Sequence, residues 1–267
     1  MGHARLGIAA GLAALALPSA GGATLTGVPS AHALVTLDPN GVLEVLEQIN
    51  LRADRPTAAT WQITMQRGEL FAAPSMHVNN RRFRAGDGIR PGTFRISRGT
   101  RGIRFDWRQP SGLASTRIAY RLALLGTAYT DVVDLPVPVW ERDWPLSVGR
   151  LTAALKVRHP PQGRVIAWIE PETLSATLAK TRRDVLLRVQ GVPARTGVTL
   201  RVVLPRNVLT SFSGVNVEEK PGLARILADR RSGDDRVWWP WVVAAALAAA
   251  VSAYALRTVR LRRPRPR

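Results

Sequence analysis

The sequence contains no cysteine, and this absence excludes several classes of function. Without thiols there is no disulfide framework, no thiolate-bound zinc or iron–sulfur site and no cysteine nucleophile. Lysine is also scarce: only three of the 38 basic residues are lysines, so the net charge of +19 comes almost entirely from arginine. The 22 glycines and 19 prolines are too few for a collagen-like or low-complexity chain of 267 residues. A folded domain with a core of its own is therefore expected.

Common catalytic motifs are missing as well. The sequence has no Gly-x-Ser-x-Gly elbow, no phosphate-binding loop and no His-Glu-x-x-His pair. The part expected to be exported keeps only His77 and His159, which are far apart in the sequence. We therefore expect a protein that is not an enzyme and that has no catalytic residues, no cofactor and no bound metal.

The amino terminus has the three-part pattern of a secretory signal. One arginine precedes an apolar run from Leu6 to Leu17, and Pro18 and small residues follow. We interpret residues 1–33 as a signal peptide that is cleaved after Ala23 or after Ala33. The alternative, an uncleaved membrane anchor, requires about 20 apolar residues, and this run is shorter.

A second apolar segment lies near the carboxyl terminus. Residues 237–256 carry no charge, and at about 1.5 Å per residue a helix of this length matches a hydrocarbon core of roughly 30 Å. The arginine-rich residues 257–267 follow, and the positive-inside rule makes this tail cytoplasmic. The predicted membrane-interface anchors are Trp238, Trp239, Trp241, Arg257 and Arg260. The sequence thus predicts a single-pass protein of the cell membrane with its amino-terminal part outside the cytoplasm.

This topology decides which partners are expected. The lipid bilayer is one, and nucleic acid is not, because the tail lacks an aromatic platform for bases. Alanines at positions 245, 249 and 253 could let another membrane helix approach closely, although alanine is also simply a good helix former.

From Leu34 onward the hydrophobic pattern alternates with period two and is interrupted by turn residues about every ten positions. Residues 38–41, Asp-Pro-Asn-Gly, predict a tight turn between the first two strands. The other expected strands are residues 60–65, 76–83, 93–97, 102–107, 116–125, 150–157, 165–169, 173–179, 184–189 and 197–204. We predict an all-β fold for residues 34–210, an antiparallel β-sandwich of immunoglobulin-like general architecture, plus one C-terminal transmembrane α-helix.

Residues 211–236 are expected to be a juxtamembrane linker with a short helix. Pro221 suits a first turn, and Leu223, Ile226 and Leu227 lie on one helical face. This face is expected to pack either on the sandwich or on the lipid.

The stretch from Tyr120 to Pro160, read together with the hairpin NGVLEVLEQINL, carries a resemblance to a known family. It resembles the amino-terminal extracellular domain of the predicted membrane proteins called domain of unknown function 2207. The positions that look like the family's are Gly41, Val45, Glu47, Tyr120, Asp131, Asp134, Trp140, Trp144 and Pro160. Two features depart from the family: residues 135–140 read LPVPVW where an aromatic-rich stretch is usual, and members are commonly longer, with more membrane segments. The resemblance implies an extracytoplasmic, membrane-attached architecture and no assigned activity.

Two acidic features suggest chemistry and also have structural explanations. Asp131 and Asp134, with Glu141 and Asp143 nearby, offer oxygen ligands for a divalent metal, but they could equally pair with arginines such as Arg142. Glu47 shares the core-facing side of its strand, where an unpartnered carboxylate is costly. We expect an arginine or a backbone group to bind it.

Arginines crowd residues 81–108 and alternate with aromatic residues. Alternation would turn the aromatic side chains inward and many arginines outward, which creates a basic face. The candidate anion-binding residues are Arg82, Arg84, Arg95 and Arg104. Guanidinium groups bind phosphate and carboxylate in a bidentate manner, so an anionic envelope polymer or lipid headgroups are candidate ligands. The alternative is a solvated face without a ligand.

The sequence therefore predicts a membrane-anchored extracytoplasmic module of the cell envelope that serves binding or assembly, with another envelope protein or an anionic polymer as its partner. The alternatives are an enzyme that depends on a divalent metal and an envelope protein that binds an anionic polymer.

Overall fold

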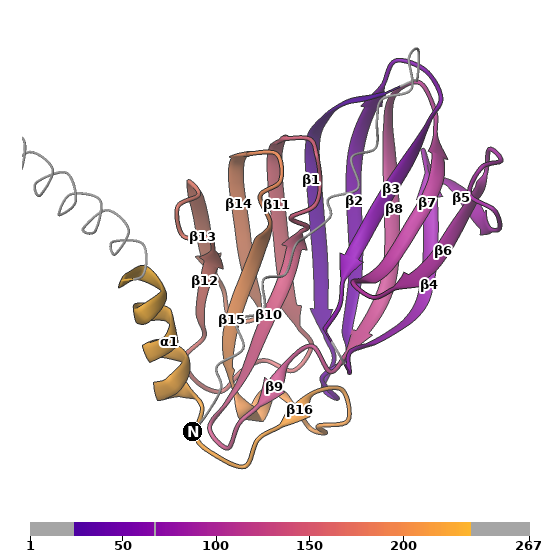
Figure 1. Cartoon of the computed structure of the whole chain (residues 1–267). Coiled ribbons are helices and arrows are strands. Elements are labelled where there is room, and N and C mark those ends of the chain that lie inside the picture. The colour runs from indigo at the N-terminus through magenta and orange to yellow at the C-terminus, as the bar shows by residue number, and fades with distance from the viewer. Residues whose placement is uncertain (1–23, 67, 236–267) are drawn as a thin grey trace, which may run out of the picture.

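The computed structural model of the chain describes residues 24–66 and 68–235. These residues form sixteen β-strands, one short 3-10 helix and one α-helix (Figure 1). The elements are β1 (Leu25–Leu37), β2 (Leu43–Ala53), β3 (Thr57–Thr64), β4 (Leu70–Val78), β5 (Arg81–Ala85), β6 (Thr93–Gly99), β7 (Gly102–Gln109), β8 (Gly112–Ala123), β9 (Thr127–Ala128), β10 (Val132–Trp140), β11 (Val148–Val157), β12 (Ile166–Glu170), β13 (Ala176–Lys180), β14 (Asp184–Val192), β15 (Val198–Pro205), η1 (Arg206–Val208), β16 (Asn216–Val217) and α1 (Leu223–Asp235).

The strands form two mixed sheets. The large sheet has eleven strands in the order β13-β14-β11-β1-β2-β8-β4-β5-β6-β7-β3, and the small sheet has five in the order β12-β15-β10-β9-β16. Strand pairs β1–β11, β5–β6 and β9–β16 are parallel. The mostly β class is therefore confirmed, but the prediction of a purely antiparallel sandwich is wrong. The reason is physical: alternation of apolar residues reports which side of a strand faces the core and says nothing about the direction of its neighbour.

The two sheets share one core. A single cluster of buried apolar side chains includes residues of β1, β2, β8, β11 and β14 from the large sheet and of β10 and β15 from the small one. The β6-β7-β3 end of the large sheet folds back over β4 and β8, and Phe105 of β7 meets Phe71 of β4 with ring centroids 6.0 Å apart (Figure 1). The buried faces of the sheet are thus covered by its own end and by the small sheet.

The predicted turn at residues 38–41 is confirmed. The amide of Gly41 donates to the Asp38 carbonyl at 2.9 Å, and the amide of Asp38 donates to the Val42 carbonyl at 2.9 Å. Gly41 has a φ of 86°, and a Cβ atom there would lie 2.7 Å from Cγ1 of Val215. Glycine is required both by the backbone conformation and by this close approach.

Strand β10 was not expected, because it contains Pro136 and Pro138, which cannot donate ladder hydrogen bonds. It pairs along its length with β15, whereas β9 pairs with it only at Val133 and Asp134. Beyond Asp134, its other edge has no strand neighbour among the described residues. The prolines are tolerated because this part of β10 is an edge.

The strand expected over residues 76–83 is instead a hairpin. β4 ends at Val78, and β5 begins at Arg81. Asn79 and Asn80 between them have φ values of 48° and 65°, which suit a two-residue turn of the type that joins twisted strands. Asparagine tolerates this conformation, and the sequence contains no glycine at this turn to mark it.

The β structure extends beyond both ends of the expected domain 34–210. β1 begins at Leu25, and β16 pairs with β9 at Asn216 and Val217. His32, which was not counted among the exported histidines, lies in β1 with its Nδ1 2.9 Å from Oγ1 of Thr152. The helix expected after Pro221 is present as α1.

None of the helices within residues 24–66 and 68–235 has the length and apolar character needed to cross a membrane. The predicted transmembrane segment 237–256, its anchors Trp238, Trp239, Trp241, Arg257 and Arg260, and residues 1–23 of the predicted signal peptide lie outside the described residues.

The extent of β1 distinguishes the two predicted cleavage sites. Cleavage after Ala33 would remove nine of the thirteen residues of β1, among them positions that pair with β11 from Val28 to Ala33. We expect the mature protein to begin directly after Ala23, and intact-mass and amino-terminal peptide spectrometry will measure this. A mature chain that begins at Leu34 would contradict the expectation.

Candidate functional site

Glu47 lies on the core face of β2 and is only 5% exposed. The hydroxyl of Tyr120 on the neighbouring β8 donates a hydrogen bond to Glu47 Oε1 at 2.7 Å. The strand register places Val45 opposite Tyr120, so Glu47 and Tyr120 are diagonal neighbours on one face of the sheet. The expected arginine or backbone partner is wrong, because a tyrosine hydroxyl from the adjacent strand takes this place.

Burial raises the pKa of Glu47 to about 8. The hydrogen bond from Tyr120 lowers this pKa, and the nearby indole N–H of Trp61 also lowers it without meeting hydrogen-bond geometry, whereas the Glu141 carboxylate adds to the increase. Burial also raises the pKa of Tyr120 well above its usual value, and Glu47 contributes to that shift. At neutral pH the pair therefore consists of two uncharged groups, which removes the cost of a charge in the core.

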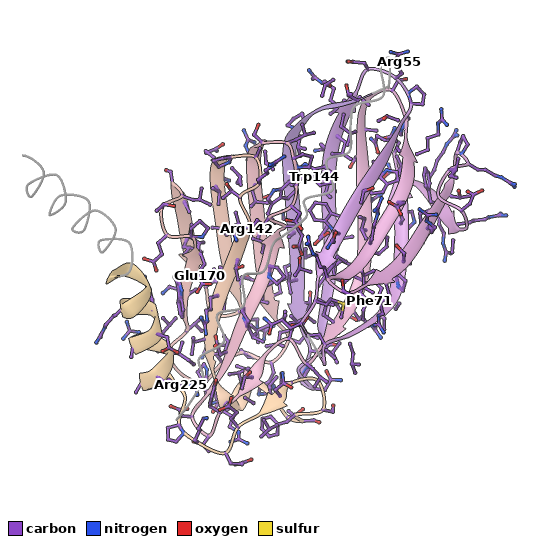
Figure 2. The ribbon with its side chains drawn as sticks, in the orientation of Figure 1. Arg55, Phe71, Arg142, Trp144, Glu170 and Arg225 are labelled. Carbon is purple, nitrogen blue, oxygen red and sulfur yellow. The ribbon has the colours of Figure 1, made fainter. Side chains whose placement is uncertain are left out.

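Three tryptophans pack together beside this pair. The ring of Trp61 on β3 lies 5.0 Å from that of Trp140 at the end of β10 and 5.2 Å from that of Trp144, measured between centroids. Trp144 is labelled near the middle of the molecule in Figure 2. Among the described residues, the indole nitrogens of all three and Oε2 of Glu47 have no hydrogen-bond partner. The structure thus brings Glu47, Tyr120, Trp140 and Trp144, four of the positions that carry the family resemblance, into one region.

Trp61 joins these residues, and sequence reasoning did not select it. Its strand was expected, and alternation along residues 57–63 turns Thr57, Ala59, Trp61 and Ile63 inward. That pattern was the available signal. It places Trp61 in the core, but it does not reveal that β3 folds over β2 and meets the end of β10.

Glu141 holds the edge of this region in place. Its Oε1 accepts a hydrogen bond from the Thr64 amide at 2.9 Å, and its Oε2 accepts one from the Thr64 hydroxyl at 2.7 Å. Burial raises the pKa of Glu141, although the Thr64 hydrogen bonds oppose this. Glu141 therefore connects the loop after β10 to the last residue of β3.

The carboxyl group of Glu47 keeps its proton at neutral pH in a closed, apolar environment. Glu47 and Tyr120 are both buried, and aromatic rings surround them, so solvent and substrate do not reach the carboxyl group in this conformation. The arrangement makes folding sensitive to pH.

Asp131 does not belong to the region around Glu47; it binds the start of helix α1. Its Oδ1 accepts a hydrogen bond from the Gly222 amide at 2.7 Å, and its Oδ2 accepts one from the Leu223 amide at 3.2 Å. Partial burial acts to raise the pKa of Asp131, but these backbone hydrogen bonds outweigh it and lower the pKa. Asp131 is therefore a cap for the first turn of α1.

Helix α1 packs on the β structure. Ile226 is 1% exposed and lies in a small cluster with Tyr129, Val132, Trp168 and Val203. Arg230 from the helix donates to Glu172 Oε1 at 2.7 Å. Of the two surfaces expected for the apolar face of this helix, the β domain is the one that Ile226 contacts.

Asp134 is engaged by an arginine on the adjacent strand. Arg201 of β15 donates through Nε to Oδ1 at 3.0 Å and through a terminal nitrogen to Oδ2 at 2.7 Å, which is a bidentate pair. Arg201 also reaches Glu170 at 3.4 Å and lies over the ring of Trp168 at 5.6 Å. The predicted partner type was correct, but the arginine is Arg201 rather than Arg142.

The acidic cluster seen in the sequence is thus dispersed in space. Asp131 caps a helix, Asp134 pairs with Arg201, Glu141 binds Thr64, and Asp143 lies 3.9 Å from Arg101. Within the described part of the chain, no three His, Asp or Glu side chains are arranged to hold a metal ion. The structure does not bring the proposed metal ligands together.

The four candidate arginines occupy the outer face of three adjacent strands, but they are not equivalent. Arg95 and Arg104 both bind Asp106, at 3.2 Å and 2.7 Å. Burial acts to raise the pKa of Asp106, but hydrogen bonds from Arg104, Thr60 and Arg95 lower it overall. Arg82 and Arg84 on β5 are exposed and form no ion pair with the described residues. Arg82 and Arg84 are therefore the two candidate arginines whose charge no described carboxylate offsets.

Comparison with known proteins supports a family assignment. The model of the family described as "Predicted membrane protein (DUF2207) N-terminal domain" matches residues 27–204. A search of curated proteins finds no match.

Solved structures show only a distant likeness. Native leukotriene A4 hydrolase from Saccharomyces cerevisiae is 9% identical over 66% of this chain and 29% of its own, with a TM-score of 0.40. The M1 zinc metallopeptidase from Deinococcus radiodurans is 12% identical over 68% of this chain and 42% of its own, with a TM-score of 0.35. The chain therefore spans less than half the length of either protein, and these similarities carry no conclusion about activity.

The raised pKa of Glu47 predicts how stability depends on pH. In the unfolded chain the carboxyl group ionises near its ordinary pKa of 4.5, whereas the folded protein keeps its proton up to about pH 8. The stabilisation is therefore complete below pH 4.5 and is lost as pH rises from 4.5 to 8, by about 1.4 kcal/mol for each pH unit crossed. Glu47→Gln, which can still accept from Tyr120, should remove this slope and be more stable than the wild type above pH 8.

Chemical denaturation at pH 5, 7 and 9 measures this effect. The matched control is Glu44→Gln on the same strand, because hydrogen bonds from Arg121 and Arg158 lower the pKa of Glu44. The control should keep the wild-type slope above pH 5. Parallel curves for the wild type and Glu47→Gln between pH 5 and pH 8 would refute the assignment.

The cap on α1 gives a further prediction. Asp131→Ala removes both acceptors for the first amides of the helix and should cost about 1 kcal/mol of stability. Hydrogen exchange in residues 222–231 should accelerate, while exchange in the large sheet stays unchanged. Glu219→Ala removes an exposed carboxylate near the helix that makes no cap, so equal acceleration in both variants would show that the Asp131 contact is not responsible.

Proposed function

This chain belongs to the family of predicted membrane proteins described as DUF2207, whose amino-terminal domain it carries, and on that basis we propose a function for it. It is a membrane-anchored protein that displays its β domain outside the membrane as a non-catalytic module for binding or assembly in the cell envelope. The bilayer is its first partner, and a second envelope component is held by the domain.

The docking of α1 is the observation that carries this proposal. Asp131 caps the helix and Ile226 is buried against the small sheet, so α1 is part of the domain rather than a free linker. The described part of the helix reaches Asp235, and the segment predicted to cross the membrane begins at residue 237. A domain joined to its anchor in this way is held in a defined orientation at the membrane surface.

The contacts of the acidic residues support a non-catalytic role. Asp131, Asp134 and Glu141 each use both carboxylate oxygens in hydrogen bonds within the protein. A general base needs a lone pair that faces the substrate, and a metal ligand needs one that faces the metal. These three carboxylates instead connect elements that are distant in the sequence.

The topology is tested by labelling single cysteines, because the natural chain has none. Ser97→Cys places a thiol at an exposed position of β6, and Arg260→Cys places one in the basic tail. In intact cells a membrane-impermeant maleimide should label the cysteine at position 97 only. The cysteine at position 260 should react only after the membrane has been permeabilised.

The cysteine-free wild type is the negative control for labelling. Reaction of position 260 in intact cells, or protection of position 97, would overturn the proposed orientation.

A further inference from the structure

A groove of about 670 Å³ lies where the β4–β5 turn, the end of β7 and the residue before β3 meet. Its wall includes the exposed residues Arg81, Arg82 and Arg108, together with the ring of Phe83 and several prolines. None of the described residues that line it is acidic. Three arginines therefore line one hollow without a neutralising carboxylate in its wall.

The charges in this groove differ from those on the rest of the basic face. Arg95 and Arg104 share Asp106, whereas Arg81, Arg82 and Arg108 form no ion pair within the described part of the chain. Like charges held close together repel each other unless an anion or water screens them. A bound anion would relieve this repulsion, and planar guanidinium groups can bind its oxygens in pairs.

Gln109 supplies a second, independent observation. Its side chain is completely buried and lies in the wall of the groove. Oε1 accepts hydrogen bonds from Trp107 Nε1 at 2.8 Å and from the Thr116 hydroxyl at 3.1 Å, which fixes the orientation of the amide because an indole nitrogen can only donate. Nε2 is left without any acceptor among the described residues. An unpaired buried donor is costly, and because Nε2 has almost no accessible surface here, an oxygen from a ligand would satisfy it only after a small shift of the groove wall.

The groove combines this positive charge with an apolar surface. The ring of Phe83 and the proline rings can pack against the apolar face of a sugar, while the arginines bind an acidic substituent. Its volume lies in the range of sites that bind small organic ligands. A charged sugar unit fits this chemistry better than a bare ion does.

The position of the groove argues against a lipid headgroup. β5 and α1 lie at opposite ends of the molecule, and α1 directly precedes the predicted membrane segment (Figure 1). The arginines therefore lie at the end of the domain that is remote from its own anchor.

We propose that this groove binds an acidic unit of an anionic sugar polymer of the cell envelope, with Arg81, Arg82 and Arg108 on its carboxylate or phosphate and Phe83 beneath its ring. The inference rests on the proposed function, since it names the component that the displayed domain holds. The groove proposal and the proposed membrane topology are tested separately. Polymer binding in solution does not depend on the topology, and cysteine labelling does not depend on polymer binding.

The test measures binding of the detergent-solubilised full chain to defined polymers. Polygalacturonate carries carboxylates, poly(glycerol phosphate) carries phosphodiesters, and dextran of similar length is neutral. At least one acidic polymer should bind, dextran should not, and the affinity should fall steeply between low and high salt. Which polymer binds more tightly identifies the acidic group.

Two variants locate the site. The double variant Arg81→Gln, Arg108→Gln should weaken binding about tenfold or more, because two charged donors are lost. Gln109→Glu keeps the acceptor for Trp107 but replaces the unpaired donor with an oxygen, so it should also weaken binding, and thermal unfolding verifies that this variant remains folded. The control is Arg98→Gln, which removes an exposed arginine of β6 that does not line the groove.

Selective loss in the double variant supports the proposal. It is overturned if neither acidic polymer binds better than dextran, or if Arg98→Gln weakens binding as much as the double variant does. Tighter binding to anionic lipid vesicles than to either polymer, equally sensitive to Arg81 and Arg108, would also overturn it and make the ligand a lipid headgroup.

Discussion

The architecture depends on one pairing, that of β1 with β11. In the large sheet, β1 hydrogen-bonds to β2 on one side and to β11 on the other, and β11 leads to β14 and β13. Among the described residues, the β1–β11 pairing is the only strand pairing that joins β11, β14 and β13 to the rest of that sheet. Because the pairing is parallel, the chain between the two strands has to return to the end of the sheet at which β1 begins. It does so through the folded-back end of the large sheet and through β10. The shared core of the two sheets follows from this return.

The region around Glu47 lies where the folded-back strand β3 meets the end of β10. β3 folds over β2, so the ring of Trp61 packs near Glu47, while Trp140 and Trp144 approach from the end of β10. An ionised carboxylate there would oppose burial of all these rings, and the raised pKa resolves the conflict by keeping Glu47 protonated at neutral pH. Four of the positions that carry the family resemblance, Glu47, Tyr120, Trp140 and Trp144, therefore share a structural explanation: they lie where the folded end of the large sheet meets the end of β10.

Local features of this fold were predictable from the sequence, and pairings were not. The alternation of apolar residues located most strands, and the spacing around Gly41 identified the first turn, because both depend on neighbouring residues only. The parallel partner of β1 lies more than a hundred residues away and leaves no local signal. The prolines of β10 argued against a strand, because proline is tolerated there only where no neighbouring strand needs its missing N–H, and the sequence does not show which strands are neighbours. The acidic residues between positions 131 and 143 are close in sequence, but successive strand residues point to opposite faces, and the loops turn the others in further directions. The sequence therefore did not identify which residues bind each of these carboxylates. The predicted basic face stays a prediction, and the sequence did not reveal that Arg95 and Arg104 share the single carboxylate of Asp106.

The parallel pairing of β1 also has a kinetic consequence. Val28 pairs with Val148, so the first strand to be synthesised waits for a partner 120 residues later in the chain. Contacts of such long sequence separation carry a large loop-closure entropy, and domains built on them fold slowly. During that interval β1 and β2 form a hairpin with one exposed, apolar edge, the kind of edge that pairs readily with other chains. A chain that reaches the outside of the membrane as proposed therefore depends on protection of this edge by a chaperone until β11 arrives, because the predicted anchor at residues 237–256 is synthesised later than β11.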